Sequence, residues 1–145
     1  MKNNEYSLER ALNILVVGSG KAGRYHLQAL KKIKKVKVVG LMNSGKVDPR
    51  ELRDLYKINN WVRSFDELEK VKHLDGIILA ISSENLINVI PSISRLKIPC
   101  LIEKPLGINL EQSEKITHYL NLSDDIINYV GYNRRFYSSF LKAQE

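Results

Sequence analysis

Residues 12–26 read LNILVVGSGKAGRYH, an aliphatic run that passes directly into a glycine-rich turn. The run from Leu12 to Val17 is almost continuously apolar, which is typical of a strand buried on both faces of a parallel sheet. After the turn, apolar residues recur at near-helical spacing while lysines take the opposite face, so we predict a helix over residues 21–34. The stretch therefore predicts a strand, a tight turn and a helix in succession.

The same alternation of aliphatic runs and amphipathic stretches continues along the chain. We predict further strands over residues 36–42, 61–62, 76–81, 98–103 and 126–132. We predict further helices from about residue 49 to 58, and over 65–71, 84–96 and 110–122. Because no hairpin signal separates the strands, the predicted fold class is α/β, a doubly wound and mainly parallel sheet with right-handed helical crossovers.

Two local details refine this prediction. Ser64 and Glu67 have the spacing of a capping box, with Ser64 as the N-cap and Glu67 at the third helical position. Pro91 lies inside a predicted helix, so we expect a kink or an early end there.

Composition limits the classes of protein. The 145 residues, 43% of them hydrophobic, suffice for one compact domain and not for two. The apolar runs are too short to cross a bilayer, and the polar N-terminus lacks the apolar core of a secretory signal, so we expect a cytoplasmic protein with no membrane partner. The single cysteine, Cys100, cannot form an internal disulfide and is expected to be a small buried hydrophobe. The three histidines give no metal-ligand spacing, so no metal is expected.

A formal charge of +7 raises the question of a nucleic-acid partner. Five of the lysines gather at one predicted helix end, where cations interact favourably with the helix dipole: Lys31, Lys32, Lys34, Lys35 and Lys37. No aromatic residues interleave with these lysines as single-strand binding requires, so we interpret them as a solvated helix end.

The glycine turn carries the first functional prediction. In its G-x-G-x-x-G pattern Gly18 permits the turn, Gly20 lets a pyrophosphate approach the backbone, and Gly23 lets the helix pack close to the sheet. The helix N-terminus presents free N–H groups to the phosphates. We therefore predict a dinucleotide site; its residues are Gly18, Ser19, Gly20, Lys21, Ala22 and Gly23. The alternative is a glycine-rich turn without a ligand.

The residue that contacts the adenosine ribose is expected at the end of the second strand, where the sequence has Asn43. An amide can bond a ribose hydroxyl and does not repel a 2′-phosphate as a carboxylate would. Ser44 and Lys46 follow and could receive that phosphate, although Lys46 could equally be an ordinary loop lysine. The cofactor prediction is thus NAD or NADP, with NADP slightly favoured.

Several further motifs appear in order along the chain. His26 follows Gly23 by three residues, DGIILA occupies residues 75–80, EKPL occupies 103–106, and VGYNRRF occupies 130–136. With these motifs the chain resembles the Gfo/Idh/MocA oxidoreductases. The resemblance implies a Rossmann domain over residues 1–131 and the start of a connection, 132–145, to a second α+β domain that these 145 residues lack.

The resemblance also implies roles for single residues. Lys104 would stand beside the nicotinamide and assist hydride transfer, and Glu103 would lie at the same site. Pro105 biases Lys104 toward extended backbone that can project the side chain into the crevice, where shielding from water would favour proton donation. The alternative is a surface lysine paired with Glu103.

The end of the fourth predicted strand is the next expected contact with the cofactor, through Ala80, Ile81 and Ser82. Here the sequence departs from the family, which usually has Thr-Pro and then a histidine four residues after the proline. Ile81-Ser82 and Leu86 occupy those places. Ser82, together with Ser83 and Asn85, is equally suited to capping the helix that follows.

Taken together, these features predict the nucleotide-binding domain of an NAD(P)-dependent oxidoreductase. The resemblance implies hydride transfer to or from a sugar, cyclitol or related polyol, given a second domain. The alternative is a non-catalytic dinucleotide-binding or interaction module. Exposed apolar surface would favour a homo-oligomer. Whether Arg134 and Arg135 contact cofactor or substrate stays open, and His26, His73 and His118 are interpreted as packed or solvated.

Overall fold

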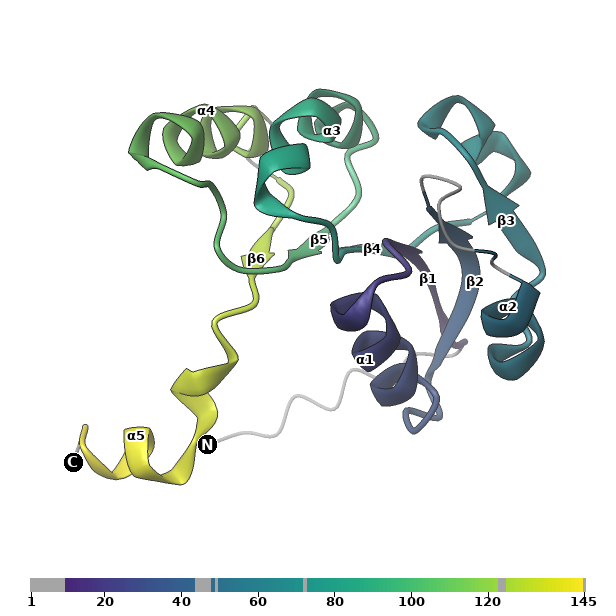
Figure 1. The fold of residues 1–145 in the computed structure, drawn as a ribbon, viewed down its shortest axis with the longest axis horizontal. Helices are drawn as coiled ribbons and strands as arrows, with labels where there is room; N and C mark the ends of the chain where they lie inside the picture. The colour runs from purple at the N-terminus through teal and green to yellow at the C-terminus, as the bar shows by residue number, and fades with distance from the viewer. Residues whose placement is uncertain (1–9, 44–47, 49, 72, 123–124, 145) are drawn as a thin grey trace.

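The computed structural model describes residues 10–43, 48, 50–71, 73–122 and 125–144 (Figure 1). Its centre is a six-stranded sheet with the order β3-β2-β1-β4-β5-β6, in which every neighbouring pair is parallel. The strands are β1 (Leu12–Val17), β2 (Val36–Met42), β3 (Asn60–Val62), β4 (Gly76–Leu79), β5 (Cys100–Ile102) and β6 (Tyr129–Val130). The predicted doubly wound α/β fold is confirmed.

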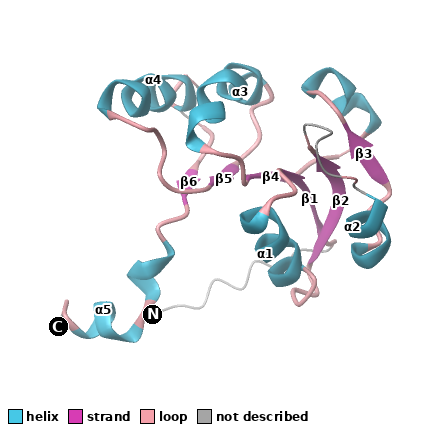
Figure 2. Cartoon of the chain, in the orientation of Figure 1, coloured by secondary structure: helices cyan, strands magenta, loops and turns pink. Residues whose placement is uncertain are grey.

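Helices cover both faces of this sheet (Figure 2). They are α1 (Lys21–Leu30), α2 (Arg50–Tyr56), η1 (Phe65–Lys70), α3 (Ser83–Arg95), α4 (Leu110–Leu120), η2 (Asn133–Phe136) and α5 (Ser138–Lys142). From β1 the chain runs outward through β2 to β3, and it then returns to β4 on the other side of β1. The strand order therefore reverses between β1 and β4, and in open parallel sheets ligands bind at the carboxyl ends of the strands beside this point.

The pleat of the strands divides the core into two clusters. One cluster joins alternate residues of β1 and β4 to α3 and α4, and it includes Leu15, Leu79, Ile90 and Ile116. The other lies on the opposite face beneath α1 and α2; its buried members are Val16, Leu27, Leu41, Leu52, Ile58, Ile78 and Ala80. Because both faces are buried, the central strands read as continuous aliphatic runs.

Several predicted boundaries were too long. α1 ends at Leu30, where i→i−3 bonds such as Lys32 N–H to the Ala29 carbonyl (3.0 Å) close a tighter turn. The strand expected over 126–132 is only Tyr129–Val130, because the Asn128 side chain takes the Cys100 backbone N–H at 3.0 Å. The strands expected over 76–81 and 98–103 are β4 and β5, which are likewise shorter.

Two local predictions need comment. Pro91 lies inside α3, which continues to Arg95, so of the predicted kink or early end the early end is wrong. In the predicted capping box, the Ser64 side chain makes no cap bond. The Glu67 carboxylate instead accepts the backbone N–H of Arg63 at 2.9 Å, one residue earlier than a capping box requires.

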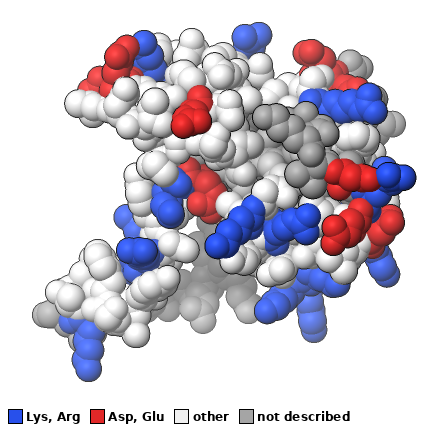
Figure 3. Space-filling view, viewed as in Figure 1, with Lys and Arg blue, Asp and Glu red and all other residues white. Residues whose placement is uncertain are grey.

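The C-terminal segment stands away from the sheet and its helices (Figures 1 and 3). Backbone hydrogen bonds of η2 and α5 join neighbouring residues of this segment, such as Tyr137 N–H to the Arg134 carbonyl at 3.0 Å. Its large apolar side chains are exposed, with Phe136 exposed to 73%. This segment therefore presents apolar surface that the sheet does not cover. Among the described residues, no helix has both the length and the apolar character that crossing a membrane requires.

Candidate functional site

The glycine turn between β1 and α1 lies at the carboxyl end of the central strand. Gly18 has φ +107°, and a Cβ there would lie 2.2 Å from the Ala80 carbonyl oxygen. A Cβ at Gly23 would lie 1.9 Å from the Gly18 carbonyl oxygen. At Gly20, by contrast, a Cβ would meet nothing within 4 Å. Two of the glycines are therefore required by the folded chain itself, whereas the third faces open space.

The open side at Gly20 coincides with the N-terminus of α1. Gly20 is the N-cap and supplies no side-chain bond, and the first turn of this ten-residue helix holds no acidic residue. Lys21, the first helical residue, is exposed, while Ala22 packs against the core beneath the helix. The helix dipole and the uncapped N–H groups at its start make this end of α1 suited to an anion.

A polar network links the glycine turn to the end of β2. Asn43 is 7% exposed and Ser19 is 6% exposed. The Asn43 Nδ2 group donates to Ser19 Oγ at 3.2 Å, and Trp61 Nε1–H donates to Asn43 Oδ1 at 3.2 Å. Asn43, the predicted ribose contact, thus lies next to the predicted pyrophosphate turn. Trp61 of β3 holds the Asn43 side chain from the other side. Ser44 and Lys46, the expected phosphate contacts, lie outside the described residues.

A guanidinium group completes this edge of the sheet. Arg63 follows β3, and its guanidinium carbon lies 4.8 Å from the centre of the Trp61 ring. Neither residue was singled out from the sequence. Their proximity to Asn43 depends on the register between β2 and β3, which pairs Leu41 with Trp61 and Met42 with Val62. The signal in the sequence that could have found them is a tryptophan in a short predicted strand, followed two residues later by an arginine.

On the other side of β1, the end of β4 borders the turn. Ala80 is 7% exposed, and its backbone N–H donates to the Val17 carbonyl at 2.8 Å. Ile81 approaches the position of a Gly18 Cβ to 3.3 Å. Ser82 is the N-cap of α3, but its Oγ accepts from Asn85 Nδ2 at 2.8 Å and caps no backbone N–H. The structure thus brings Ala80 and Ile81 against the glycine turn.

The Glu103 side chain bonds across the crevice to α1. His26 Nε2 donates to Glu103 Oε1 at 2.8 Å, and both side chains are largely buried, with 21% and 25% exposure. His26 is therefore packed, which is one of the two interpretations given for it from the sequence, and its partner is Glu103. The alternative interpretation of Lys104, as a surface lysine, paired it with Glu103. In the structure Glu103 is instead paired with His26.

Lys104 follows Glu103 and is exposed in this structure, so the shielding from water that we expected is absent here. The Lys104–Pro105 peptide is cis. The Ser83 hydroxyl donates to the Pro105 carbonyl at 2.7 Å, which ties this loop to the start of α3. The Ser83 bond holds the backbone that follows Lys104, while the Lys104 side chain is accessible.

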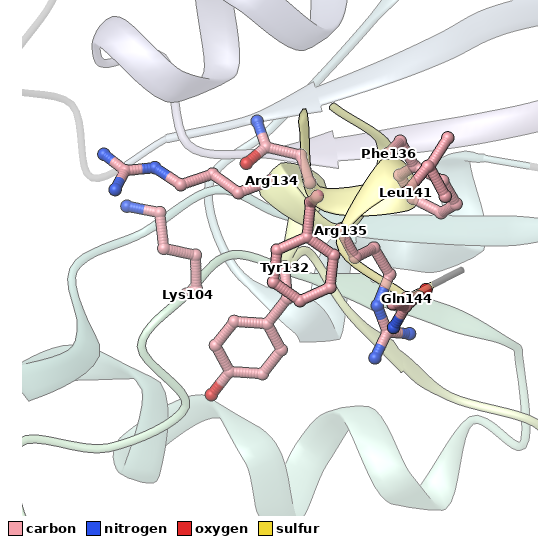
Figure 4. Close-up of a pocket in the computed structure, with 9 residues that line it drawn as sticks. Lys104, Tyr132, Arg134, Arg135, Phe136, Leu141 and Gln144 are labelled. Atoms are coloured by element: carbon pink, nitrogen blue, oxygen red, sulfur yellow. The ribbon is translucent and has the colours of Figure 1, made fainter. Parts of the chain in front are cut away.

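A cavity of about 850 Å³ lies between Lys104 and the C-terminal segment. Figure 4 shows the Lys104 and Arg134 side chains extending toward the same side, whereas Arg135 lies near Gln144. The lining residues are Lys104, Tyr132, Asn133, Arg134, Arg135, Phe136, Phe140, Leu141 and Gln144. This cavity begins just beyond the carboxyl end of β5, at Lys104.

The remaining sequence candidates lie elsewhere. Cys100 is buried in β5, and burial raises the pKa of its thiol to about 12. His118 lies on α4 with its ring 6.1 Å from that of Tyr119, and His73 precedes β4. The basic cluster lies between α1 and the start of β2, at the opposite edge of the sheet from the glycine turn, and all five lysines are exposed. In Figure 3, Lys and Arg side chains lie on several elements of the visible face, with acidic side chains among them.

The strand order, the glycine turn at the switch point and the open N-terminus of α1 define a dinucleotide-binding Rossmann domain. Residues 12–131 match a family described as an oxidoreductase family with an NAD-binding Rossmann fold, GFO_IDH_MocA. The chain belongs to this family, as the resemblance indicated.

Individual relatives show how much of a family member the chain represents. It is 24% identical over 134 residues to the myo-inositol 2-dehydrogenase of Thermotoga maritima, a match that covers 92% of this chain and 40% of that protein. The structure of Lactobacillus casei scyllo-inositol dehydrogenase with bound NAD(H) and scyllo-inositol superposes with a TM-score of 0.80 at 22% identity, over 93% of this chain and 40% of that one. GenD2 from gentamicin A biosynthesis, in complex with NAD, gives 0.78 at 18% identity over 92% and 38%. The chain thus spans about 40% of the length of the relatives it matches.

Proposed function

We propose that this chain binds NAD or NADP at the carboxyl end of its sheet and forms the cofactor half of an enzyme that transfers hydride from a polyol or to the corresponding carbonyl compound. The observation that carries this is the space at Gly20. A Cβ there meets nothing within 4 Å, although the glycines on either side are tightly packed. A pyrophosphate at the start of α1 would occupy that space and accept from its backbone N–H groups.

Different residues at the carboxyl end of the sheet would contact different parts of the bound cofactor. The adenosine ribose would lie near Asn43, the pyrophosphate over residues 18–23, and the nicotinamide near Ala80 to Ser82 and Lys104. The bound cofactor would supply the hydride in reduction and accept it in oxidation of the substrate. The chain's own part is to hold the two phosphates at α1 and to present the accessible Lys104 ammonium to a reacting oxygen.

The substrate class is proposed from the relatives, which include inositol dehydrogenases. A polyol would approach Lys104 from the cavity that the C-terminal segment helps to line. Residues 132–145 would then begin the connection to a second domain that closes the substrate side. The exposed apolar side chains of this segment, Phe136 and Phe140 among them, favour that reading and also favour self-association of the isolated chain.

The test is calorimetric titration of the purified chain with NADH and with NADPH. We expect saturable binding that Gly20→Val abolishes and that Lys35→Ala, at the opposite edge of the sheet, leaves unchanged. Thermal melting of each variant checks that the fold is retained. Absence of binding by both cofactors, or equal binding by Gly20→Val, would refute the dinucleotide site.

The second candidate function is a dinucleotide-binding or interaction module without catalysis. The apolar Leu86, which stands where the family usually has a histidine and is 2% exposed, favours it. An oxidoreductase assay of the chain, alone and joined to any coding sequence downstream of residue 145, separates the two. Turnover of a cyclitol that Lys104→Ala abolishes, with cofactor binding retained, supports the enzyme; cofactor binding without turnover in both forms supports the module.

A further inference from the structure

We propose that Arg63 is a specificity residue that binds the 2′-phosphate of NADP, and that this chain therefore prefers NADPH to NADH. The inference rests on the proposed dinucleotide site. The sequence-based preference for NADP combined Asn43 with Ser44 and Lys46 as the phosphate contacts; here the phosphate contact is Arg63, a residue whose position the structure describes.

Arg63 lies on the side of the sheet that carries the glycine turn. Leu41 and Trp61 are register partners, and Leu41 belongs to the core cluster beneath α1. Trp61 therefore shares that face, and the contacts of Asn43 and Arg63 with the Trp61 side chain place both residues there, just beyond the strand ends. The guanidinium is thus placed on the same side as the glycine turn, next to the proposed ribose contact.

The Trp61 ring is a platform that holds the Arg63 guanidinium. The Arg63 guanidinium carbon lies 4.8 Å from the centre of the Trp61 ring, and Trp61 is itself fixed by its 3.2 Å bond to Asn43 Oδ1. An arginine that stacks on an aromatic face keeps its N–H groups directed outward in the plane, where they can donate to two phosphate oxygens at once. The platform therefore limits the conformational entropy that the arginine loses on binding a phosphate.

The charges around Arg63 favour a bound anion. Asn43 stands where a carboxylate would repel a 2′-phosphate. The Glu67 carboxylate accepts the Arg63 backbone N–H at 2.9 Å. Arg63 is exposed, and in the part of the chain that the structure describes its guanidinium makes no ion pair. A phosphate dianion would thus meet a cation that is oriented but not neutralised.

The experiment isolates the adenosine half of the cofactor. The probes are 2′,5′-ADP and 5′-AMP, which differ by the 2′-phosphate, titrated by calorimetry into the wild-type chain, Arg63→Ala and Arg63→Lys. The matched control is Arg95→Ala, which removes an exposed arginine at the far end of α3. NADH and NADPH are titrated in parallel with the same proteins.

We expect the wild type to bind 2′,5′-ADP at least about tenfold more tightly than 5′-AMP, a difference of about 1.4 kcal/mol. Arg63→Ala should reduce that ratio to near one, Arg63→Lys should keep part of it because the charge remains without the fork, and Arg95→Ala should keep all of it. A wild-type ratio near one, or a ratio that Arg63→Ala leaves intact, would overturn the assignment. If NADH and NADPH bind equally and Gly20→Val abolishes both, the dinucleotide site stands and only this inference fails; if neither binds, both fail.

Discussion

Replacing Gly20 by alanine should separate cofactor binding from folding. The new methyl group meets nothing within 4 Å, and Gly20 has φ −71° and ψ −168°, which is ordinary extended backbone. Removing a glycine stabilises by about 0.4–1 kcal/mol through the unfolded chain. Alanine is a poorer N-cap than glycine by about the same amount. The two effects offset, so the free energy of unfolding should stay within about 1 kcal/mol of wild type, a change of roughly 2–4 °C or less in Tm.

Gly23→Ala is the matched control with the opposite outcome. Its methyl would lie 1.9 Å from the Gly18 carbonyl oxygen, so backbone must move. Overpacking of this severity destabilises by about 3 kcal/mol, which corresponds to a fall of about 6–12 °C in Tm for a domain of this size. The same chemical change, three residues apart, should thus leave the stability of one variant close to that of the wild type and clearly lower that of the other.

The assay pairs thermal unfolding with calorimetric titration of NADPH. Gly20→Ala should lose at least about tenfold in affinity, or about 1.4 kcal/mol, because the methyl occupies the space proposed for the pyrophosphate. Our reasoning would be refuted if Gly20→Ala unfolded at a much lower temperature, or if it bound the cofactor as tightly as the wild type. Retention of the wild-type Tm by Gly23→Ala would equally contradict the packing described for the turn.

Three further predictions concern other parts of the chain. Since burial raises the pKa of Cys100 to about 12, Ellman's reagent should leave this thiol unmodified in the folded chain at pH 8 and modify it rapidly in urea, and rapid reaction without denaturant would contradict its burial. Bonds from the Arg10 guanidinium and then from a backbone N–H lower the pKa of Asp75, so its ionised form stabilises the fold above the ordinary aspartate pKa of about 4, and this contribution is lost as the pH falls through the lowered value. Urea midpoints should therefore fall more between pH 5 and pH 2 for the wild type than for Asp75→Asn, and parallel curves would count against the pairing. His26→Leu leaves the Glu103 carboxylate without its 2.8 Å partner, so urea denaturation at pH 7 should show a loss of about 1–2 kcal/mol, with His26→Gln intermediate; an unchanged midpoint would show that the bond contributes nothing to stability.

Most of the fold could be predicted because its strands are buried on both faces. The runs that became β1 and β4 are aliphatic except for Asn13 and Gly76, and the glycine turn fixes where the first strand ends. The ends of elements were less predictable because single side-chain bonds decide them. Asn128, for example, bonds the Cys100 backbone N–H, and β6 pairs with β5 only after that residue.

The candidate site divides in the same way. The glycine turn and Asn43 could be located because each directly follows a recognisable strand. The contacts between His26 and Glu103, and between Trp61, Arg63 and Asn43, could not, because they join residues that are far apart in the sequence and meet only through sheet register and helix placement. Sequence periodicity gives the face on which a residue lies, but it does not give its partner on a neighbouring element.

The bond from Trp61 to Asn43 has a practical consequence for spectroscopy. Trp61 is the single tryptophan among the 145 residues, so the indole emission of the whole chain originates beside the proposed ribose contact. The native protein therefore carries an intrinsic fluorophore at this edge of the sheet. Quenching of that emission by added nucleotide, or energy transfer from the indole to a reduced nicotinamide, would report occupancy of the crevice at low protein concentration and without any label.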